Sequence, residues 1–289
     1  MTLTKQEWKT LEDKAHSLRK LILDTTRCAG GGHIGGCLSI IDIMTALYYK
    51  EMHFDPKKYD DPDRDRCIVS KGHAGIATAC LFSDLGLIDP AELKSYNKTG
   101  SRLNVHLDSK KIPGLDASTG SLGHGSAMAL GMALAAKMSN RSYKTYVLLG
   151  DGECDEGSVW ESAMATAHFK ATNLITIVDR NYNMIDGKTE DVMSLEPFAD
   201  KWAAFGFDVK VIDGHDFRQI CDAIEYAKLA QDKPVVIIAN TVKGNGISYM
   251  AGNYKWHHGS IDEEKYTIGM NDLEKYHQEK LALIEKEGK

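Results

Sequence analysis

Apolar residues near the N-terminus recur with the spacing of an amphipathic helix. Between residues 5 and 26 the apolar positions fall three or four residues apart, at Trp8, Leu11, Ala15, Leu18 and Ile22. This period places them on one side of an α-helix and leaves the charged residues of the segment toward solvent. The pattern therefore predicts a long helix that packs on a core along one stripe.

The middle of the chain shows a different pattern, in which short apolar runs alternate with helical segments. Tyr146–Leu149 and Leu174–Val178 are nearly continuous apolar runs, as is typical of strands buried on both faces of a parallel sheet. Further strands are predicted at residues 67–70, 209–212 and 235–239, and helices at 39–49, 126–138, 158–171 and 217–231. This alternation predicts a doubly wound α/β fold with a mainly parallel sheet. We expect one domain over residues 1–265 and a charged helical tail at 266–289.

Composition limits the class of protein. The 289 residues are 43% hydrophobic and 26% charged, so the chain can bury a sizeable core. A net charge of −6 argues against nucleic acid or an anionic membrane as a partner. The charged N-terminus lacks the apolar core of a signal peptide, and the run Ala127–Ala136 is too short to cross a bilayer. None of the six cysteines forms a CxxC pair, so we expect reduced thiols in a cytoplasmic protein.

Residues with metal-binding chemistry follow two of the predicted strands. A GDG segment at 150–152 ends the first strand, and Asn-Tyr-Asn at 181–183 follows the second about thirty residues later. Ligands bind outside the carboxyl ends of parallel strands, so these residues are predicted to share one site. The Asp151 carboxylate, the Asn181 amide oxygen and the Asn183 backbone carbonyl would ligate Mg²⁺, with Ca²⁺ or Mn²⁺ as substitutes. Two oxygens of a diphosphate and a water would complete the shell.

Two glycines flank the carboxylate of this predicted site. Gly150 and Gly152 would let the backbone approach phosphate groups closely, and a helix that begins near Ser158 would point its N-terminus toward them. GDG is also a good turn sequence, so a plain strand–turn–helix connection is the alternative interpretation of this motif alone. Its combination with Asn181 at the end of the next strand favours a cation and diphosphate site.

GDG followed by a strand-terminal asparagine resembles the signature of thiamine diphosphate enzymes. Over about residues 10–260 the chain resembles the transketolase family, through several motifs in the same order. They are GHIGG at 32–36, SKGH at 70–73, TGSLGHG at 119–125, GDGECDEG at 150–157, VDRNYNMIDG at 178–187 and TVKG at 241–244. The resemblance implies the fold of a thiamine diphosphate-binding domain, with thiamine diphosphate and Mg²⁺ as cofactors.

The resemblance also implies roles for individual residues. It makes catalytic residues of four histidines, which would align substrate and transfer protons: His33, His73, His106 and His258. It implies cofactor contacts for His73, Gly120, Leu122, Gly150, Asp151, Gly152, Glu156, Glu161, Asn181 and His258. Glu156 and Glu161 would join a carboxylate network across a subunit interface, although both also suit the acidic first turn of a helix. His257 is the alternative to His258, and His124 stands where full-length transketolases typically carry Gln.

Transketolases also need a glutamate against the aminopyrimidine of the cofactor, and in this family it lies in a second, pyrimidine-binding domain. We therefore expect this chain to be the N-terminal subunit of a split transketolase. Its partner would be a separate C-terminal subunit with the pyrimidine-binding and C-terminal domains, in an α2β2 assembly. The implied reaction transfers a two-carbon ketol unit from a ketose phosphate to an aldose phosphate.

Other functions share parts of this pattern. The α subunit of a 2-oxo-acid dehydrogenase, or of another split thiamine diphosphate enzyme, would share GDG and Asn181. The glycine–histidine motifs and the IDG at 185–187 favour transketolase. A specialised transketolase that acts on unusual pentose phosphates is a further alternative. A non-catalytic protein that binds thiamine diphosphate is another, but it would not explain the four histidines.

Overall fold

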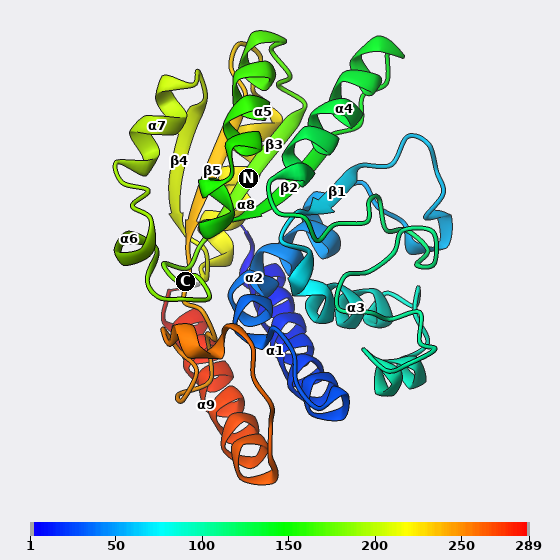
Figure 1. Ribbon diagram of the computed structural model, residues 1–289, viewed down its shortest axis with the longest axis vertical. Helices are drawn as coiled ribbons and strands as arrows, with labels where there is room; N and C mark the ends of the chain where they lie inside the picture. The colour runs from blue at the N-terminus through cyan, green and yellow to red at the C-terminus, as the bar shows by residue number, and fades with distance from the viewer. Residues whose placement is uncertain (1–2, 288–289) are drawn as a thin grey trace.

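The computed structural model describes residues 3–287, in which a parallel sheet lies between two layers of helices (Figure 1). Five strands form the sheet in the order β1-β2-β3-β5-β4, and every neighbouring pair is parallel. The strands are β1 (Arg66–Val69), β2 (Thr145–Gly150), β3 (Leu174–Arg180), β4 (Asp208–Asp213) and β5 (Val235–Asn240). Each lies where the sequence predicts a strand, which confirms the α/β prediction.

Helices connect the strands and cover both faces of the sheet. They are α1 (Lys5–Ala29), α2 (Ile34–Ala46), α3 (Gly75–Asp84), α4 (His124–Met138), α5 (Gly157–His168), α6 (Thr189–Val192), α7 (Phe198–Ala204), α8 (Phe217–Lys228) and α9 (Glu263–Glu287). The helices expected at 126–138, 158–171 and 217–231 are α4, α5 and α8. Helices α6 and α7 occupy a segment for which the sequence pattern predicted neither helix nor strand.

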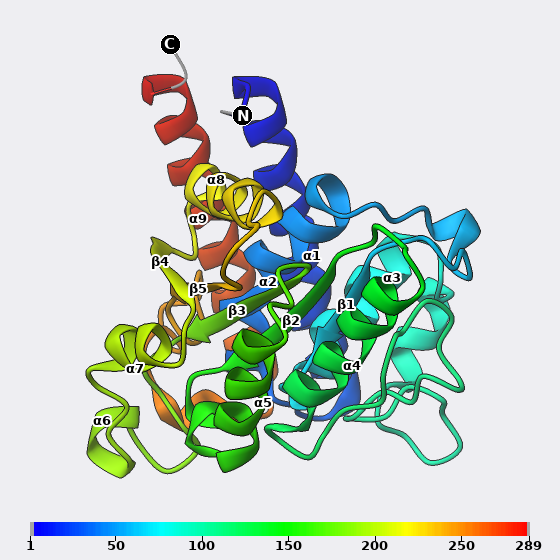
Figure 2. The same ribbon diagram turned by 90° about the horizontal axis from the view of Figure 1, so that it is seen from above.

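Adjacent residues of one strand pack into opposite layers. Tyr146 and Leu148 join the core beneath α1, α2, α3, α8 and α9, whereas Val147 and Leu149 join the core beneath α4, α5 and α7. Side chains alternate along a strand, so only a continuous apolar run fills both cores. Figure 2 shows the two helical layers on opposite sides of the sheet.

Helix α2 begins at Ile34 rather than at the predicted residue 39, because Gly35 and Gly36 belong to the helix and not to a loop. A Cβ atom at Gly35 would lie 2.4 Å from the Trp256 carbonyl oxygen and 2.9 Å from Lys243 Cγ. Glycine here therefore allows close packing against two later segments. The start of α2 is thereby held against the carboxyl end of the sheet.

Helix α9 lies alongside α1 in both views (Figures 1 and 2). Leu273 and Ile284 of α9 are buried in the same core as the apolar stripe of α1. The charged helical tail expected at 266–289 is thus part of a helix that begins at Glu263 and docks on the body of the protein over its described length. Within residues 3–287, no helix combines the length and apolar character required to cross a bilayer.

Candidate active site

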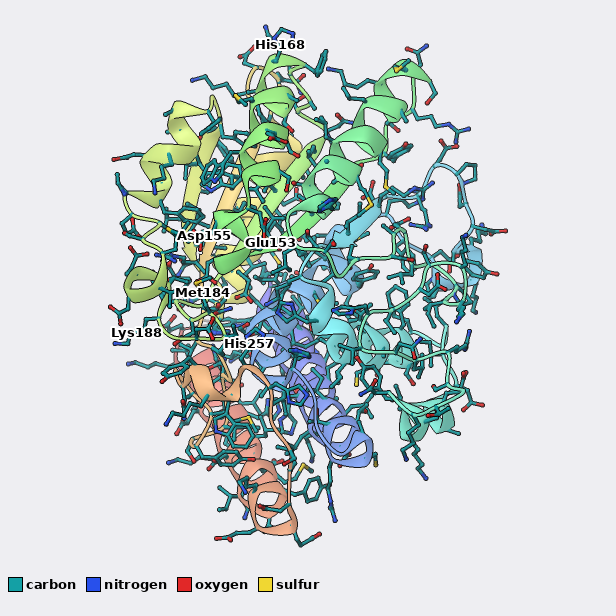
Figure 3. The ribbon with its side chains drawn as sticks, in the orientation of Figure 1. Glu153, Asp155, His168, Met184, Lys188 and His257 are labelled. Carbon is teal, nitrogen blue, oxygen red and sulfur yellow. The ribbon has the colours of Figure 1, made fainter. Side chains whose placement is uncertain are left out.

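A cavity of about 320 Å³ lies beyond the carboxyl ends of β1, β2 and β3. It brings together residues that are far apart in the sequence. Of the site residues predicted above, His33, His73, His106, Gly120, Leu122, Gly150, Asp151, Gly152, Asn181 and Asn183 line this cavity. In Figure 3, Glu153, Met184 and His257 mark three segments that border it.

Three predicted site residues do not line the cavity. His258 packs against His33 with ring centroids 4.9 Å apart, whereas its neighbour His257 faces the cavity. Glu156 and Glu161 are exposed at the start of α5 and along its outer face. The structure of this chain therefore places both glutamates on its surface.

Asp151 is 2% exposed and lies at the end of β2. Its Oδ1 accepts a hydrogen bond from the Gly152 N–H at 2.9 Å, and its Oδ2 accepts one from the Tyr182 N–H at 2.6 Å. Burial and the neighbouring Asp179 carboxylate raise the Asp151 pKa to about 6, although Arg180 opposes the shift. This carboxylate is thus held in one orientation by backbone groups and has little solvent to stabilise its charge.

Asn181 and Asn183 present oxygen atoms beside Asp151. The Asn181 Oδ1 accepts from the Asn183 N–H at 3.2 Å, and the Asn183 Oδ1 is buried without a hydrogen-bond partner. Among residues 3–287, no three His, Cys, Asp or Glu side chains form a group that could hold a metal ion. A cation here would therefore rely on one carboxylate, amide and carbonyl oxygens, and oxygens of a ligand. Such an all-oxygen set suits a hard cation such as Mg²⁺.

Two buried lysines bring positive charge to the same cavity. Lys71 follows β1, is 1% exposed and forms an ion pair with Asp179. Lys243 is 2% exposed, and its Nζ donates to the Asn183 carbonyl oxygen at 2.8 Å. Burial and the charge of Lys71 lower the Lys243 pKa to about 8. Sequence reasoning assigned neither lysine a role, although both lie in motifs that it used, SKGH and TVKG.

Glu153 fixes the loop between β2 and α5. One of its oxygens accepts from the Ser70 hydroxyl and from the Gly123 N–H, and the other accepts from the Gly150 N–H. Three segments that line the cavity are thus tied to one carboxylate. Sequence reasoning missed this residue as well, because an acidic residue after GDG gives no sign of its partners.

The side chains of three histidines lie close together at the cavity. The ring centroid of His33 lies 5.4 Å from that of His73 and 5.3 Å from that of His257, and the His73 and His257 centroids are 5.0 Å apart. Burial and neighbouring cationic groups lower the pKa of His33 to about 4, that of His73 to about 2 and that of His257 to about 3. These three imidazoles are therefore neutral at pH 7 and can each donate and accept a hydrogen bond.

Comparison with known proteins assigns the family. A family model described as "Transketolase, thiamine diphosphate binding domain" matches residues 11–280. This chain belongs to the transketolase family. It is 41% identical over 278 residues to one subunit of the apulose-4-phosphate transketolase of Phocaeicola vulgatus, covering 96% of this chain and 97% of the relative. A 6-deoxy-6-sulfo-D-fructose transketolase subunit from a Clostridium species is 41% identical over 265 residues, with 92% and 96% covered.

Full-length transketolases match through only part of their length. Human transketolase is 35% identical over 253 residues, which make up 87% of this chain and 40% of the human protein. The crystal structure of the Campylobacter jejuni enzyme superimposes with a TM-score of 0.81 at 31% identity, covering 96% of this chain and 47% of that one. These matches confirm the α/β fold and the assignment to the N-terminal, thiamine diphosphate-binding part of transketolase, a part that occurs as a separate subunit in the first two relatives.

Proposed function

We propose that this chain binds thiamine diphosphate and Mg²⁺ and, with a C-terminal subunit, transfers a two-carbon ketol unit from a ketose phosphate to an aldose phosphate. The cavity beyond β1, β2 and β3 is the observation that carries this proposal. It combines oxygen ligands for one cation, two buried lysines and a group of neutral histidines. When bound, thiamine diphosphate supplies the carbon nucleophile of the reaction, and the protein supplies orientation and proton transfer.

The metal site consists of the Asp151 carboxylate, the Asn181 Oδ1 and the Asn183 carbonyl oxygen. Lys243 already contacts the Asn183 carbonyl and is positioned to neutralise a diphosphate held by the same cation. A Cβ atom at Gly152 would lie 2.9 Å from Met184 Cγ, so a larger residue at this position would crowd the metal-binding loop. We assign Gly120, Leu122, Gly150 and Gly152 to the cofactor site because all four line the cavity.

The histidines handle the sugar substrate. His33, His73 and His106 line the cavity, where their imidazoles would donate hydrogen bonds to sugar hydroxyl groups and accept protons from them. His257 faces the cavity, so we assign it the contact expected of one member of the His257–His258 pair. His258 supports His33 by packing against its ring.

The partner subunit would contribute the glutamate that contacts the aminopyrimidine. A surface for assembly is offered by helices α4 and α5, which lie side by side on one layer (Figures 1 and 2). Ala127, Gly131 and Ala135 are exposed small residues spaced four apart along α4, and Glu156 and Glu161 are exposed at the start of α5 and along it. We propose that two copies of the chain meet here in an α2β2 enzyme, with residues 1–265 as the diphosphate-binding domain. The cytoplasmic location stays a prediction from composition.

The substrates of the relatives define the first panel to assay. Relatives above 40% identity are named for apulose 4-phosphate and 6-deoxy-6-sulfofructose, and full-length relatives are named transketolase. The chain should be co-expressed with its C-terminal companion and tested with xylulose 5-phosphate and with these two ketoses. Ketol transfer supports the proposal. Decarboxylation of 2-oxo acids without ketol transfer would favour a 2-oxo-acid dehydrogenase subunit instead.

The metal assignment has its own test. Asp151→Ala removes the one charged metal ligand, so binding of thiamine diphosphate in the presence of Mg²⁺ should be lost when measured by calorimetry. Asp155→Ala is the matched control, because Asp155 lies in the same loop but does not line the cavity. Unchanged affinity in Asp151→Ala would refute the metal assignment.

A further inference from the structure

A nearly buried histidine beside the cavity has no part in the proposed reaction. His215 lies in the loop between β4 and α8 and is 8% exposed. It does not line the cavity, yet its ring contacts the chain segment that carries Lys243. His215 is therefore close enough to influence the position of Lys243.

Both ring nitrogens of His215 have defined partners. The Val242 backbone N–H donates to Nε2 at 2.9 Å, and Nδ1 lies 2.7 Å from Asp42 Oδ2. A backbone N–H is always a donor, so Nε2 must be unprotonated and Nδ1 must carry the hydrogen that Asp42 accepts. The ring is therefore a neutral connector between a carboxylate and the backbone of residue 242.

The carboxylate on which this histidine rests is itself fixed. Arg19 donates to the two oxygens of Asp42 at 2.8 and 2.6 Å, and both side chains are at most 2% exposed. Burial opposes ionisation, but the Arg19 guanidinium and the His215 hydrogen bond hold the Asp42 pKa well below its usual range. The chain Arg19–Asp42–His215 thus connects α1 and α2 to the segment after β5.

The backbone of residues 242–244 makes three hydrogen bonds to other segments. The Val242 N–H bonds to His215, the Lys243 carbonyl accepts from the Gly252 N–H at 2.8 Å, and the Gly244 N–H donates to the Gly35 carbonyl at 2.9 Å. The Val242 side chain is 39% exposed and contributes little packing. The His215 contact is the one of these three made by a side chain, so a substitution can remove it.

We infer that His215 is a positioning residue that sets the place of the Lys243 ammonium in the cofactor cavity. The inference rests on the proposed function, in which Lys243 neutralises the diphosphate. Without the Val242 hydrogen bond the segment after β5 can shift, and the Lys243 Nζ would no longer be held 2.8 Å from the Asn183 carbonyl. The consequence is weaker binding of a diphosphate, with the fold retained.

The test measures binding of inorganic pyrophosphate with Mg²⁺ by calorimetry, which requires neither substrate nor the companion subunit. His215→Ala should weaken binding about tenfold, the equivalent of one hydrogen bond of roughly 1.4 kcal/mol. Lys243→Met should weaken it more, by about a hundredfold, because it removes a buried charge opposite the ligand. In the double variant the His215 substitution should add less than about twofold, since the group through which it acts is gone.

Three further variants test whether the effect of His215→Ala is specific to the hydrogen bond with Val242. His277→Ala is the matched control, because His277 is also 8% exposed and paired with Asp13 but lies between α9 and α1; its pyrophosphate affinity should be unchanged. His215→Gln keeps an acceptor near the position of Nε2 and should bind within about threefold of wild type. His215→Asn, which can reach Asp42 but not Val242, replaces the alanine variant if that one does not fold.

The outcomes separate the two proposals. If the losses of His215→Ala and Lys243→Met add fully in the double variant, His215 acts on the fold in general and the inference is overturned. An unchanged affinity in His215→Ala overturns it as well. A wild-type chain that binds neither pyrophosphate nor thiamine diphosphate would overturn the proposed function, and this inference with it.

Discussion

The buried ion pair between Lys71 and Asp179 lies next to the cavity, and its removal should greatly lower the free energy of unfolding of the chain. Asp179 Oδ2 accepts from the Ser39 hydroxyl at 2.6 Å, from the Asn181 amide at 3.3 Å and from the Lys71 ammonium. Its Oδ1 accepts from the Thr241 hydroxyl. One carboxylate therefore connects α2 with the ends of β1, β3 and β5.

Asp179→Asn preserves the shape of the side chain and removes its charge. The amide nitrogen can occupy the place of Oδ1, since the Thr241 hydroxyl can turn and become an acceptor. The main loss is then the partner of the Lys71 ammonium, whose remaining acceptor is the Gly36 carbonyl at 2.9 Å. Breaking a buried pair by removing one member costs about 3–5 kcal/mol. That is a large share of the roughly 5–15 kcal/mol that stabilises a typical domain.

Urea unfolding followed by circular dichroism measures this loss at pH 7. Burial disfavours the Asp179 carboxylate, but Lys71 and the hydroxyl donors lower its pKa. A carboxyl group whose pKa is lowered by folding stabilises the folded state at pH values above its unfolded-state pKa of about 4. This stabilisation is lost as the pH falls toward the folded-state pKa. The difference between wild type and Asp179→Asn should therefore be constant between pH 6 and pH 8 and shrink below about pH 4.

A double variant separates the ion pair from the other hydrogen bonds. Lys71→Met combined with Asp179→Asn leaves no unpaired charge, so its cost should be at least about 2 kcal/mol less than the sum of the single costs. The exposed pair between Arg141 and Asp63 is the control, and Asp63→Asn should cost less than about 1 kcal/mol. A loss below about 1 kcal/mol in Asp179→Asn, or full additivity in the double variant, would refute this account of the ion pair.

Three further predictions follow from burial and packing. Burial raises the Glu12 pKa to about 7, so the chain loses stability as the pH rises from about 4 to 7. In urea unfolding, Glu12→Gln should therefore stabilise the chain by up to about 3 kcal/mol at pH 8 and have little effect at pH 4. A Cβ atom at Gly125 would lie 2.2 Å from Ser70 Oγ, so Gly125→Ala should lower the melting temperature. A Cβ atom at Gly131 of α4 would meet open space, so Gly131→Ala should raise the stability of the chain by about 0.5–1 kcal/mol. A thiol reagent should modify one cysteine in the native chain, the exposed Cys28, before unfolding releases the other five; rapid modification of a second cysteine would contradict the buried environments of the rest.

The strands were predictable because their burial leaves a direct trace in the sequence. A strand covered on both faces is apolar at most of its positions, and β2 and β3 show this in the nearly continuous runs Tyr146–Leu149 and Leu174–Val178. Helices α6 and α7 left no such trace. They are short, and α7 buries only Phe198 and Trp202, so no apolar period extends far enough to be recognised.

The sequence predicted those residues of the cavity whose positions are determined by the geometry of the parallel sheet. Parallel strands place their carboxyl ends at one edge, which brings Asp151 and Asn181 together in any sheet with this strand order. Which of two adjacent histidines faces the cavity depends on the turn of a short 3₁₀ helix, Tyr254–His257, whose orientation the sequence does not reveal. The roles of Lys71 and Lys243 depend likewise on partners more than fifty residues away.

The carboxyl groups at the cavity bear on the proposal that a second chain completes the active site. Among the residues that line it, the acidic ones are Asp151 and Glu153. Backbone N–H groups hold both oxygens of each, and Ser70 adds a further bond to Glu153. Neither is placed to make a new contact with an aminopyrimidine without giving up the bonds that shape the cavity. Under the proposed function, this half of the site would bind and orient the diphosphate end of the cofactor, and the acid that activates its other end would come from the partner subunit.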